Sequence, residues 1–258
     1  IPVIIFIKEG LFLSNPRWSL KRKKGKAKQY IRKIIYPEEY LLLSDDDLYE
    51  LIKKLLYVDA YKEQYTNPIH YKGKDLALGL ERLIFMDLKS NIPFVTYSKG
   101  NRLYSKESDF TLTYQTDGFI KNQNNELKTL YDYENLVKLS YFNYYINHQN
   151  DLNYKEEIIL FESHSNKKNF IGTVFLNLSY NKLKISSKKF SEIFLFDKIL
   201  NMSIQGKRQI IIYINDNTYL LKLNELSSPY KYLLTYQYYL FIKNGGKNID
   251  EQLYQFGL

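Results

Sequence analysis

The chain has 258 residues, of which 45% are hydrophobic and 25% are charged. These values are typical of folded globular proteins and exclude wholesale disorder, and the length suits two modest domains with separate cores. The sequence contains no cysteine, which excludes disulfides, thiol nucleophiles and thiolate metal sites. No apolar run approaches the roughly 20 residues that a membrane-spanning helix needs, so we expect no transmembrane segment.

The first predicted element is a buried strand over residues 1–7. Every residue of this run is apolar, and its one proline, Pro2, stands at the start, where a strand tolerates it. Gly10 is expected to end it. Because Ile1 already lies inside the run and no initiator Met precedes it, we expect the sequence to begin within a longer protein.

The segment from Arg17 to Lys33 carries nine basic side chains and no acidic one. The rest of the chain has 28 basic and 28 acidic side chains, so this segment accounts for the whole formal charge of +9. A neutral body with one positive segment indicates a surface that lies against phosphate, lipid or nucleic acid. Residues 26–36, which overlap the end of this segment, suit a second, solvent-facing strand.

Within this basic segment Trp18 stands beside the basic cluster of residues 21–24, a combination typical of protein segments that lie at a membrane interface. Each Lys or Arg near an anionic leaflet contributes about 1 kcal/mol. The predicted membrane- or phosphate-binding residues are Arg17, Trp18, Lys21, Arg22, Lys23, Lys24, Lys26 and Lys28. Two simpler interpretations stay open: the segment is a solvated strand and loop, and Trp18 is a core residue.

Two helices are expected next. Pro37-Glu38-Glu39 resembles a first helical turn, and Ser44 followed by three aspartates is an N-cap with acids that complement the helix dipole. The apolar stripe behind this cap consists of Leu48, Leu51, Ile52, Leu55 and Leu56. A second helix is predicted over residues 74–85, because leucines recur there at helical spacing.

Short alternating runs between residues 93 and 120 predict a small β-ribbon, and a polar linker leads from it to an aromatic-rich helix over 130–147. Six or seven strands then follow from Glu156 onward, and a helix capped by Ser228-Pro229 runs to about Lys243. Antiparallel strands closed by a C-terminal helix outline a PH- or GRAM-like barrel. Another small α+β sandwich has the same pattern.

A two-residue motif of the type that acyltransferases use occurs at His70 and Asp75, with four residues between them. In such a site the carboxylate orients the imidazole, which takes a proton from an attacking hydroxyl. Because the motif is short and follows a turn-like Thr66-Asn67-Pro68, we interpret it as a chance occurrence. His148 and His164 are expected at the surface. We predict no catalytic residue, no metal site and no cofactor within this chain.

Several segments, in order, resemble the C-terminal half of bacterial lysophospholipid acyltransferases of the 1-acyl-glycerol-3-phosphate acyltransferase family. The sharpest match is Tyr71-Lys72-Gly73-Lys74-Asp75-Leu76-Ala77, followed by Leu80-Glu81-Arg82-Leu83-Ile84-Phe85. The other matching segments are Ile1-Pro2-Val3, Phe12 to Trp18, Leu43 to Glu50, Leu56 to Tyr61, Asp117 to Ile120 and Leu130 to Glu134. The order of these loose motifs, more than any one of them, carries the resemblance.

The resemblance implies an α+β chain. It begins with the last strands of an acyltransferase core (1–36), continues with a helical segment (37–92), a ribbon (93–122) and a linker helix (123–151), and ends with a PH/GRAM-like barrel (152–258). In relatives the ribbon carries two Cys-x-x-Cys pairs suited to zinc. The corresponding residues here are Met86 and Lys89, then Ser105 and Ser108, which cannot hold the ion.

The function implied is acyl transfer to 1-acyl-glycerol-3-phosphate or a similar lysolipid in phospholipid biosynthesis. The family's catalytic His-x4-Asp block would precede Ile1, so we expect no turnover from this chain alone. The implied partners are an anionic membrane surface and, in a full-length enzyme, a lysophospholipid and acyl-CoA or acyl carrier protein. The implied location is cytoplasmic and peripheral on the inner membrane face. The alternative is a non-enzymatic anion-binding module that uses residues 17–33, with nucleic acid the less favoured partner because no aromatic platform lies within that run.

Overall fold

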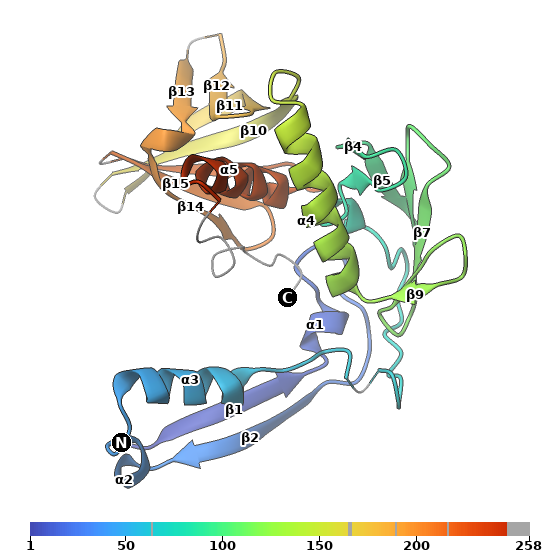
Figure 1. Ribbon diagram of the computed structural model, residues 1–258, viewed down its shortest axis with the longest axis vertical. Helices are drawn as coiled ribbons and strands as arrows, with labels where there is room; N and C mark the ends of the chain where they lie inside the picture. Colours follow the sequence, from blue (N-terminus) through green and yellow to red (C-terminus); the bar gives the residue numbers. More distant parts are fainter. Residues whose placement is uncertain (63, 165–166, 189, 216, 247–258) are drawn as a thin grey trace.

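The computed structural model describes residues 1–246 except 63, 165–166, 189 and 216. It is a mixed α+β structure, which confirms the α+β part of the predicted fold class. Figure 1 shows a small strand-helix unit at the N-terminal end, a central helix, and β-sheets on both sides of that helix. No helix within the described residues is long and apolar enough to cross a bilayer.

The N-terminal unit is a two-stranded antiparallel sheet covered on one face by a helix. Its elements are β1 (Val3–Glu9), α1 (Leu11–Ser14), β2 (Lys28–Ile35), α2 (Pro37–Tyr40) and α3 (Asp45–Leu56). Alternation places Ile5 and Ile7 against α3, where they form a small core with Ile35. The predicted N-cap is confirmed, because the Ser44 hydroxyl accepts a hydrogen bond from the Asp47 amide at 3.1 Å.

The middle of the chain forms a ribbon and a long helix. The short elements are η1 (Leu80–Arg82), β3 (Met86–Asp87) and β4 (Ile92–Pro93). A five-stranded sheet follows with β5 (Thr96–Lys99), β6 (Arg102–Ser105), β7 (Thr111–Tyr114), β8 (Ile120–Lys121) and β9 (Leu127–Lys128) in consecutive order. Helix α4 (Leu130–Asn147) has the predicted bounds, and a reciprocal capping box of Thr129 and Asp132 begins it.

The helix predicted over residues 74–85 is wrong, since only the single turn η1 forms there. Asp75 and Gly79 have positive φ angles of 54° and 93°, which interrupt a right-handed helix. The amide of Gly79 donates to the Ser98 hydroxyl at 3.0 Å instead of to a carbonyl one turn back. Leu76, Leu80 and Leu83 of this segment are buried in a loop of the core, so their spacing does not mark one face of a helix.

The C-terminal part is a curled seven-stranded antiparallel sheet closed by a helix, which is compatible with a PH-like domain. The strands are β10 (Asn153–His164), β11 (Lys167–Ser179), β12 (Lys182–Ser186), β13 (Ser191–Leu195), β14 (Ile199–Gln205), β15 (Gln209–Ile214) and β16 (Asn217–Lys222). Their order is β13-β12-β11-β10-β16-β15-β14. A short η2 (Phe196–Lys198) precedes β14, and α5 (Pro229–Lys243) begins at the predicted Ser228 cap.

One large hydrophobic cluster runs from the loop after α1 through the ribbon and α4 into the curled sheet and α5. Helix α4 lies between the ribbon and the C-terminal part (Figure 1) and contacts both. Its Tyr141 packs edge-on against Phe85 at 5.0 Å between ring centroids, and its hydroxyl lies 2.6 Å from the Thr235 hydroxyl of α5. The ribbon and the curled sheet therefore share a core.

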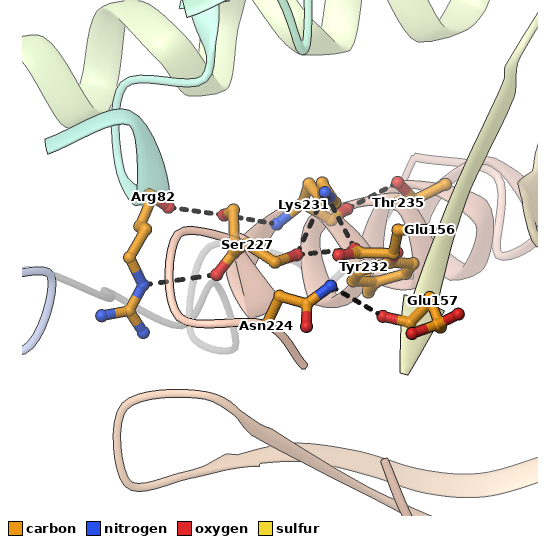
Figure 2. Close-up of polar contacts among 9 residues, drawn as sticks. Arg82, Glu156, Glu157, Asn224, Ser227, Lys231, Tyr232 and Thr235 are labelled. Atoms are coloured by element: carbon orange, nitrogen blue, oxygen red, sulfur yellow. Dashed lines mark hydrogen bonds and ion pairs between the residues drawn. The ribbon is translucent and has the colours of Figure 1, made fainter. Parts of the chain in front are cut away.

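A buried polar network fixes the start of α5 to the rest of the chain (Figure 2). The Glu156 carboxylate on β10 accepts hydrogen bonds from the hydroxyls of Ser227, at 2.6 Å, and Tyr232. It also pairs with the Lys231 ammonium at 3.1 Å, which lies 3.5 Å above the Tyr154 ring. Burial lowers the pKa of Lys231 to about 8, although Glu156 opposes this shift. On the other side, the Arg82 guanidinium donates to the Ser227 carbonyl at 3.3 Å, which ties η1 to the same loop.

Candidate functional site

A backbone bridge between Lys24 and Lys72 gathers most of the exposed basic side chains of this region. Each of these two residues donates its amide to the other's carbonyl, at 2.7 and 2.8 Å. The bridge joins two basic stretches that lie about fifty residues apart in the sequence. We call the resulting exposed set the cationic surface, and its members are Lys21, Arg22, Lys24, Lys26, Lys72 and Lys74.

The charge of the cationic surface is almost uncompensated. Lys21 pairs with Asp75 at 2.7 Å between two half-exposed side chains, a contact of small energy. The other five members form no ion pair within the described part of the chain. Cations that outnumber the neighbouring acids in this way produce a field that concentrates anions.

Close packing holds the basic loop in place. Gly25 lies flat against the Tyr71 ring, so that an added Cβ would be 2.2 Å from the ring's Cδ1 atom. The Tyr71 hydroxyl donates to the carbonyl of Lys26 at 3.1 Å. Only a residue without a side chain allows this approach, and the tyrosine then fixes the backbone from residue 24 to 26. The exposed lysines of this loop are therefore attached to a backbone that Tyr71 holds in place.

Two of the eight predicted binding residues are wrong as surface contacts, because Trp18 and Lys23 are buried, with 0% and 2% exposure. The Trp18 ring packs edge-on against Tyr114, with centroids 5.1 Å apart. The Lys23 ammonium lies 4.3 Å above the Trp18 ring and donates to the Ser19 hydroxyl at 3.1 Å. Trp18 is therefore a core residue, as the alternative interpretation of the sequence held, and Lys23 is its cation–π partner.

Burial, together with the nearby charge of Lys207, lowers the pKa of Lys23 to about 7 from the ordinary 10.5. Between these values the unfolded chain binds more protons than the folded one, so the free energy of unfolding rises with pH. The destabilisation by buried Lys23 is therefore largest below pH 7 and disappears towards pH 10.5. We therefore expect Lys23→Met to raise the free energy of unfolding at pH 6 more than at pH 9. Urea unfolding at the two pH values measures this, and an equal change at both would contradict it.

The remaining predicted residues are all exposed, although two of them lie outside the cationic surface. Arg17 precedes the buried Trp18, and Lys28 begins β2. Lys72 and Lys74 were missed, although both stand in the motif Tyr71-Lys72-Gly73-Lys74. To predict that these two lysines share a surface with the first basic segment, one would have had to know of the Lys24–Lys72 bridge.

His70 and Asp75 do not act together in this structure. His70 Nδ1 lies 2.7 Å from the Thr116 hydroxyl, whereas the Asp75 carboxylate accepts from Lys21. The carboxylate therefore does not orient the imidazole as an acyl-transfer site requires. The side chain of His164 lies outside what the structure describes.

The ribbon brings together residues 86–89 and 105–108, which the sequence resemblance predicted to correspond to two cysteine pairs. Asp87, next to Met86, accepts a hydrogen bond from the Ser108 hydroxyl at 2.6 Å and another from the Ser90 amide at 3.1 Å. Lys89 pairs with Asp109 across the same gap. No group of three potential metal-ligating side chains occurs among the described residues. A buried carboxylate thus links the turns through hydrogen bonds.

Burial alone raises the pKa of Asp87, but hydrogen bonds from Ser108, Ser105 and Ser90 outweigh it and lower the pKa to about 2. The carboxylate thus contributes stability above its ordinary pKa of 3.8, and this is lost as the pH falls towards 2. We expect Asp87→Asn to destabilise the protein by about 2 kcal/mol, because hydrogen bonds to a charged group are lost. Thermal unfolding at pH 7 measures the change.

The matched control for Asp87→Asn is Asp109→Asn, which removes the same charge from the exposed side of the ribbon. We expect this variant to leave the melting temperature almost unchanged. Equal effects of the two substitutions would show that the buried carboxylate has no special role.

No family model matches the sequence, and no curated protein matches it. Among solved structures, the N-terminal PH domain of human ARAP2 is similar with 9% sequence identity and a TM-score of 0.27. The match covers 39% of this chain and 89% of that domain.

Proposed function

We propose that this chain is the C-terminal, membrane-facing part of a glycerophospholipid acyltransferase, and that the cationic surface holds it against an anionic leaflet. The observation that carries the proposal is the gathering of six exposed cations around the Lys24–Lys72 bridge. The curled C-terminal sheet with α5 serves as a non-catalytic PH-like accessory domain.

The energetics of the cationic surface favour a membrane. At about 1 kcal/mol for each Lys or Arg near an anionic leaflet, six side chains supply several kcal/mol, enough for reversible association. The field of this surface falls off within a Debye length of about 10 Å at 0.1 M salt, so binding should weaken as salt rises. The chain would be peripheral on the inner, cytoplasmic face.

Support for the acyltransferase part comes from the ordered sequence motifs and from the ribbon. Residues 86–89 and 105–108 would correspond to the two cysteine pairs of the family, and these segments meet through Asp87 and Ser108. The acyl transfer itself would use a His-x4-Asp block outside this sequence, with a lysophospholipid and an acyl-CoA or acyl carrier protein as substrates.

Two experiments test the proposal. The first measures co-sedimentation of the chain with phosphatidylcholine vesicles and with vesicles that also contain phosphatidylglycerol. We expect strong binding to the anionic vesicles that weakens with salt, and equal, salt-insensitive binding to both would contradict the membrane function. The second reads the coding sequence upstream of Ile1, where an in-frame His-x4-Asp motif is expected and its absence would contradict the acyltransferase assignment.

A gel-shift assay with single- and double-stranded nucleic acid completes the first experiment. Phosphate contacts would give nucleic-acid affinity that also falls with salt, so salt dependence alone does not separate the two partners. We expect weak gel shifts beside strong vesicle binding. Tight nucleic-acid binding without a preference for anionic vesicles would replace the proposal by a nucleic-acid-binding module.

A further inference from the structure

Two further cations, Lys207 and Arg208, line a cavity between the basic loop and the curled sheet. The cavity has a volume of about 290 Å³ and is lined by Leu20 on one side and by the β14–β15 turn, Gln205 to Gln209, with Glu225 on the other. We call it the junction cavity. Small-molecule sites often lie between structural units, and this volume is at the lower end of their range, which suits a small ligand.

The turn reaches across the junction through Lys207. Its ammonium donates to the Ser19 carbonyl at 2.6 Å and to the Asn15 side-chain oxygen at 2.9 Å. These contacts position the charge at the rim of the cavity, and they come from neutral oxygens that leave the positive charge uncompensated. Arg208, the next residue, faces Glu225 at 3.7 Å, a long contact to a carboxylate whose side chain is 74% exposed.

Further cations lie behind this rim. The buried Arg82 guanidinium donates to the Trp18 carbonyl at 3.1 Å, and Lys23 lies over the ring of the same residue. Burial lowers the pKa of Lys207, and the charge of Arg82 adds to that shift. Burial likewise lowers the pKa of Arg82 to about 10, where Glu81 opposes the shift and Arg208 adds to it. The cations thus act on one another, and an anion between them would relieve the repulsion.

We infer that the junction cavity binds a phosphate monoester group through the Lys207 ammonium and the Arg208 guanidinium. The phosphate would displace the Glu225 carboxylate from Arg208. The chemistry fits this class of anion. A planar guanidinium donates to two phosphate oxygens at once, a lysine contributes a point charge, and the amides of Gln205 and Gln209 add neutral donors. A monoester carries close to two negative charges, against one for a phosphodiester.

This inference goes beyond the proposed function and does not depend on it. The site lies at residues 205–209 of the curled sheet, whereas the cationic surface lies at residues 21–26 and 72–74. The substitutions that test one site change no residue of the other. Loss of phosphate binding and loss of vesicle binding are therefore separate results.

The test titrates inorganic phosphate into the full chain at constant ionic strength and follows heat release and the melting temperature. We expect saturable binding that Arg208→Gln weakens about tenfold, because a charge-assisted pair is lost. Glu225→Gln should instead tighten binding, because the competing carboxylate is removed. Opposite signs from two neighbouring residues cannot result from general destabilisation, and each variant's unfolding without phosphate checks its fold. The matched control is Lys184→Gln, which removes the same charge at an exposed residue of β12 and should bind as the unmodified chain does.

A vesicle arm distinguishes the source of the phosphate. Phosphatidic acid exposes a monoester at the membrane, whereas phosphatidylglycerol exposes only a diester. If the ligand is a lipid headgroup, Arg208→Gln selectively weakens binding to phosphatidic acid vesicles; if it is a soluble phosphate ester, only the free-phosphate titration changes. Absence of phosphate binding by the unmodified chain, or equal binding by the Arg208 and Glu225 variants, would overturn the inference.

Discussion

Neutralising four lysines of the cationic surface together, Lys24→Gln, Lys26→Gln, Lys72→Gln and Lys74→Gln, is expected to abolish binding to anionic vesicles at physiological salt. At about 1 kcal/mol for each charge, the loss is about 4 kcal/mol, or close to a thousandfold in affinity. All four side chains are exposed, and the Lys24–Lys72 bridge uses only backbone atoms, so the fold should remain. Vesicle co-sedimentation measures the affinity, and circular dichroism checks the fold.

The matched control replaces four exposed lysines elsewhere, Lys99, Lys106, Lys184 and Lys198, by Gln. This change lowers the net charge equally but leaves the cationic surface intact. We expect it to retain most of the vesicle binding. If both quadruple variants lose binding alike, net charge and not the local surface is responsible.

Removing the buried carboxylate of Glu156 is expected to have the largest effect on folding. Its carboxylate accepts hydrogen bonds from the hydroxyls of Ser227 and Tyr232. It also pairs with the ammonium of Lys231, a residue that is only 3% exposed. Without Glu156 the ammonium is left in the core with no opposite charge, which typically costs about 3–5 kcal/mol. Chemical denaturation of Glu156→Ala measures this loss.

Two further variants isolate the cause of that loss. Glu157→Ala removes the next carboxylate, which is exposed and whose contact with Asn224 uses only its backbone carbonyl, so its stability should be nearly unchanged. The double variant Glu156→Leu with Lys231→Met replaces the pair by apolar groups and should regain most of the stability. A double variant as unstable as Glu156→Ala would show that the lost hydrogen bonds, and not the unpaired ammonium, dominate.

The predictable part of the fold consists of elements whose signals are local. The helix 130–147 has a cap of its own at Thr129, and the helix after Ser44 combines a cap with an apolar stripe. The helix predicted over residues 74–85 is wrong because the backbone turns at Asp75 and Gly79, and the spacing of apolar residues does not reveal these turns.

The candidate site was predictable in its location and not in its membership. Local charge identified the basic segment, but the burial of Trp18 and Lys23 depends on Tyr114, about ninety residues away. Lys72 enters the surface only through its bridge to Lys24. The junction cavity joins Leu20 to the turn after β14 and left no pattern in the sequence. Long-range contacts of this kind follow from tertiary packing, which one sequence does not display.

The most direct test of the account places a fluorescent reporter on the cationic surface. Because the chain has no cysteine, Ala27→Cys introduces a single labelling site beside Lys26 without removing a charge, and Asn201→Cys does the same on exposed β14. With phosphatidylglycerol vesicles at physiological salt, the dye at residue 27 should shift to shorter emission wavelengths and be shielded from a water-soluble quencher, while the dye at residue 201 stays unchanged. Equal responses at both residues, or a response at residue 201 alone, would contradict the proposed membrane-facing surface.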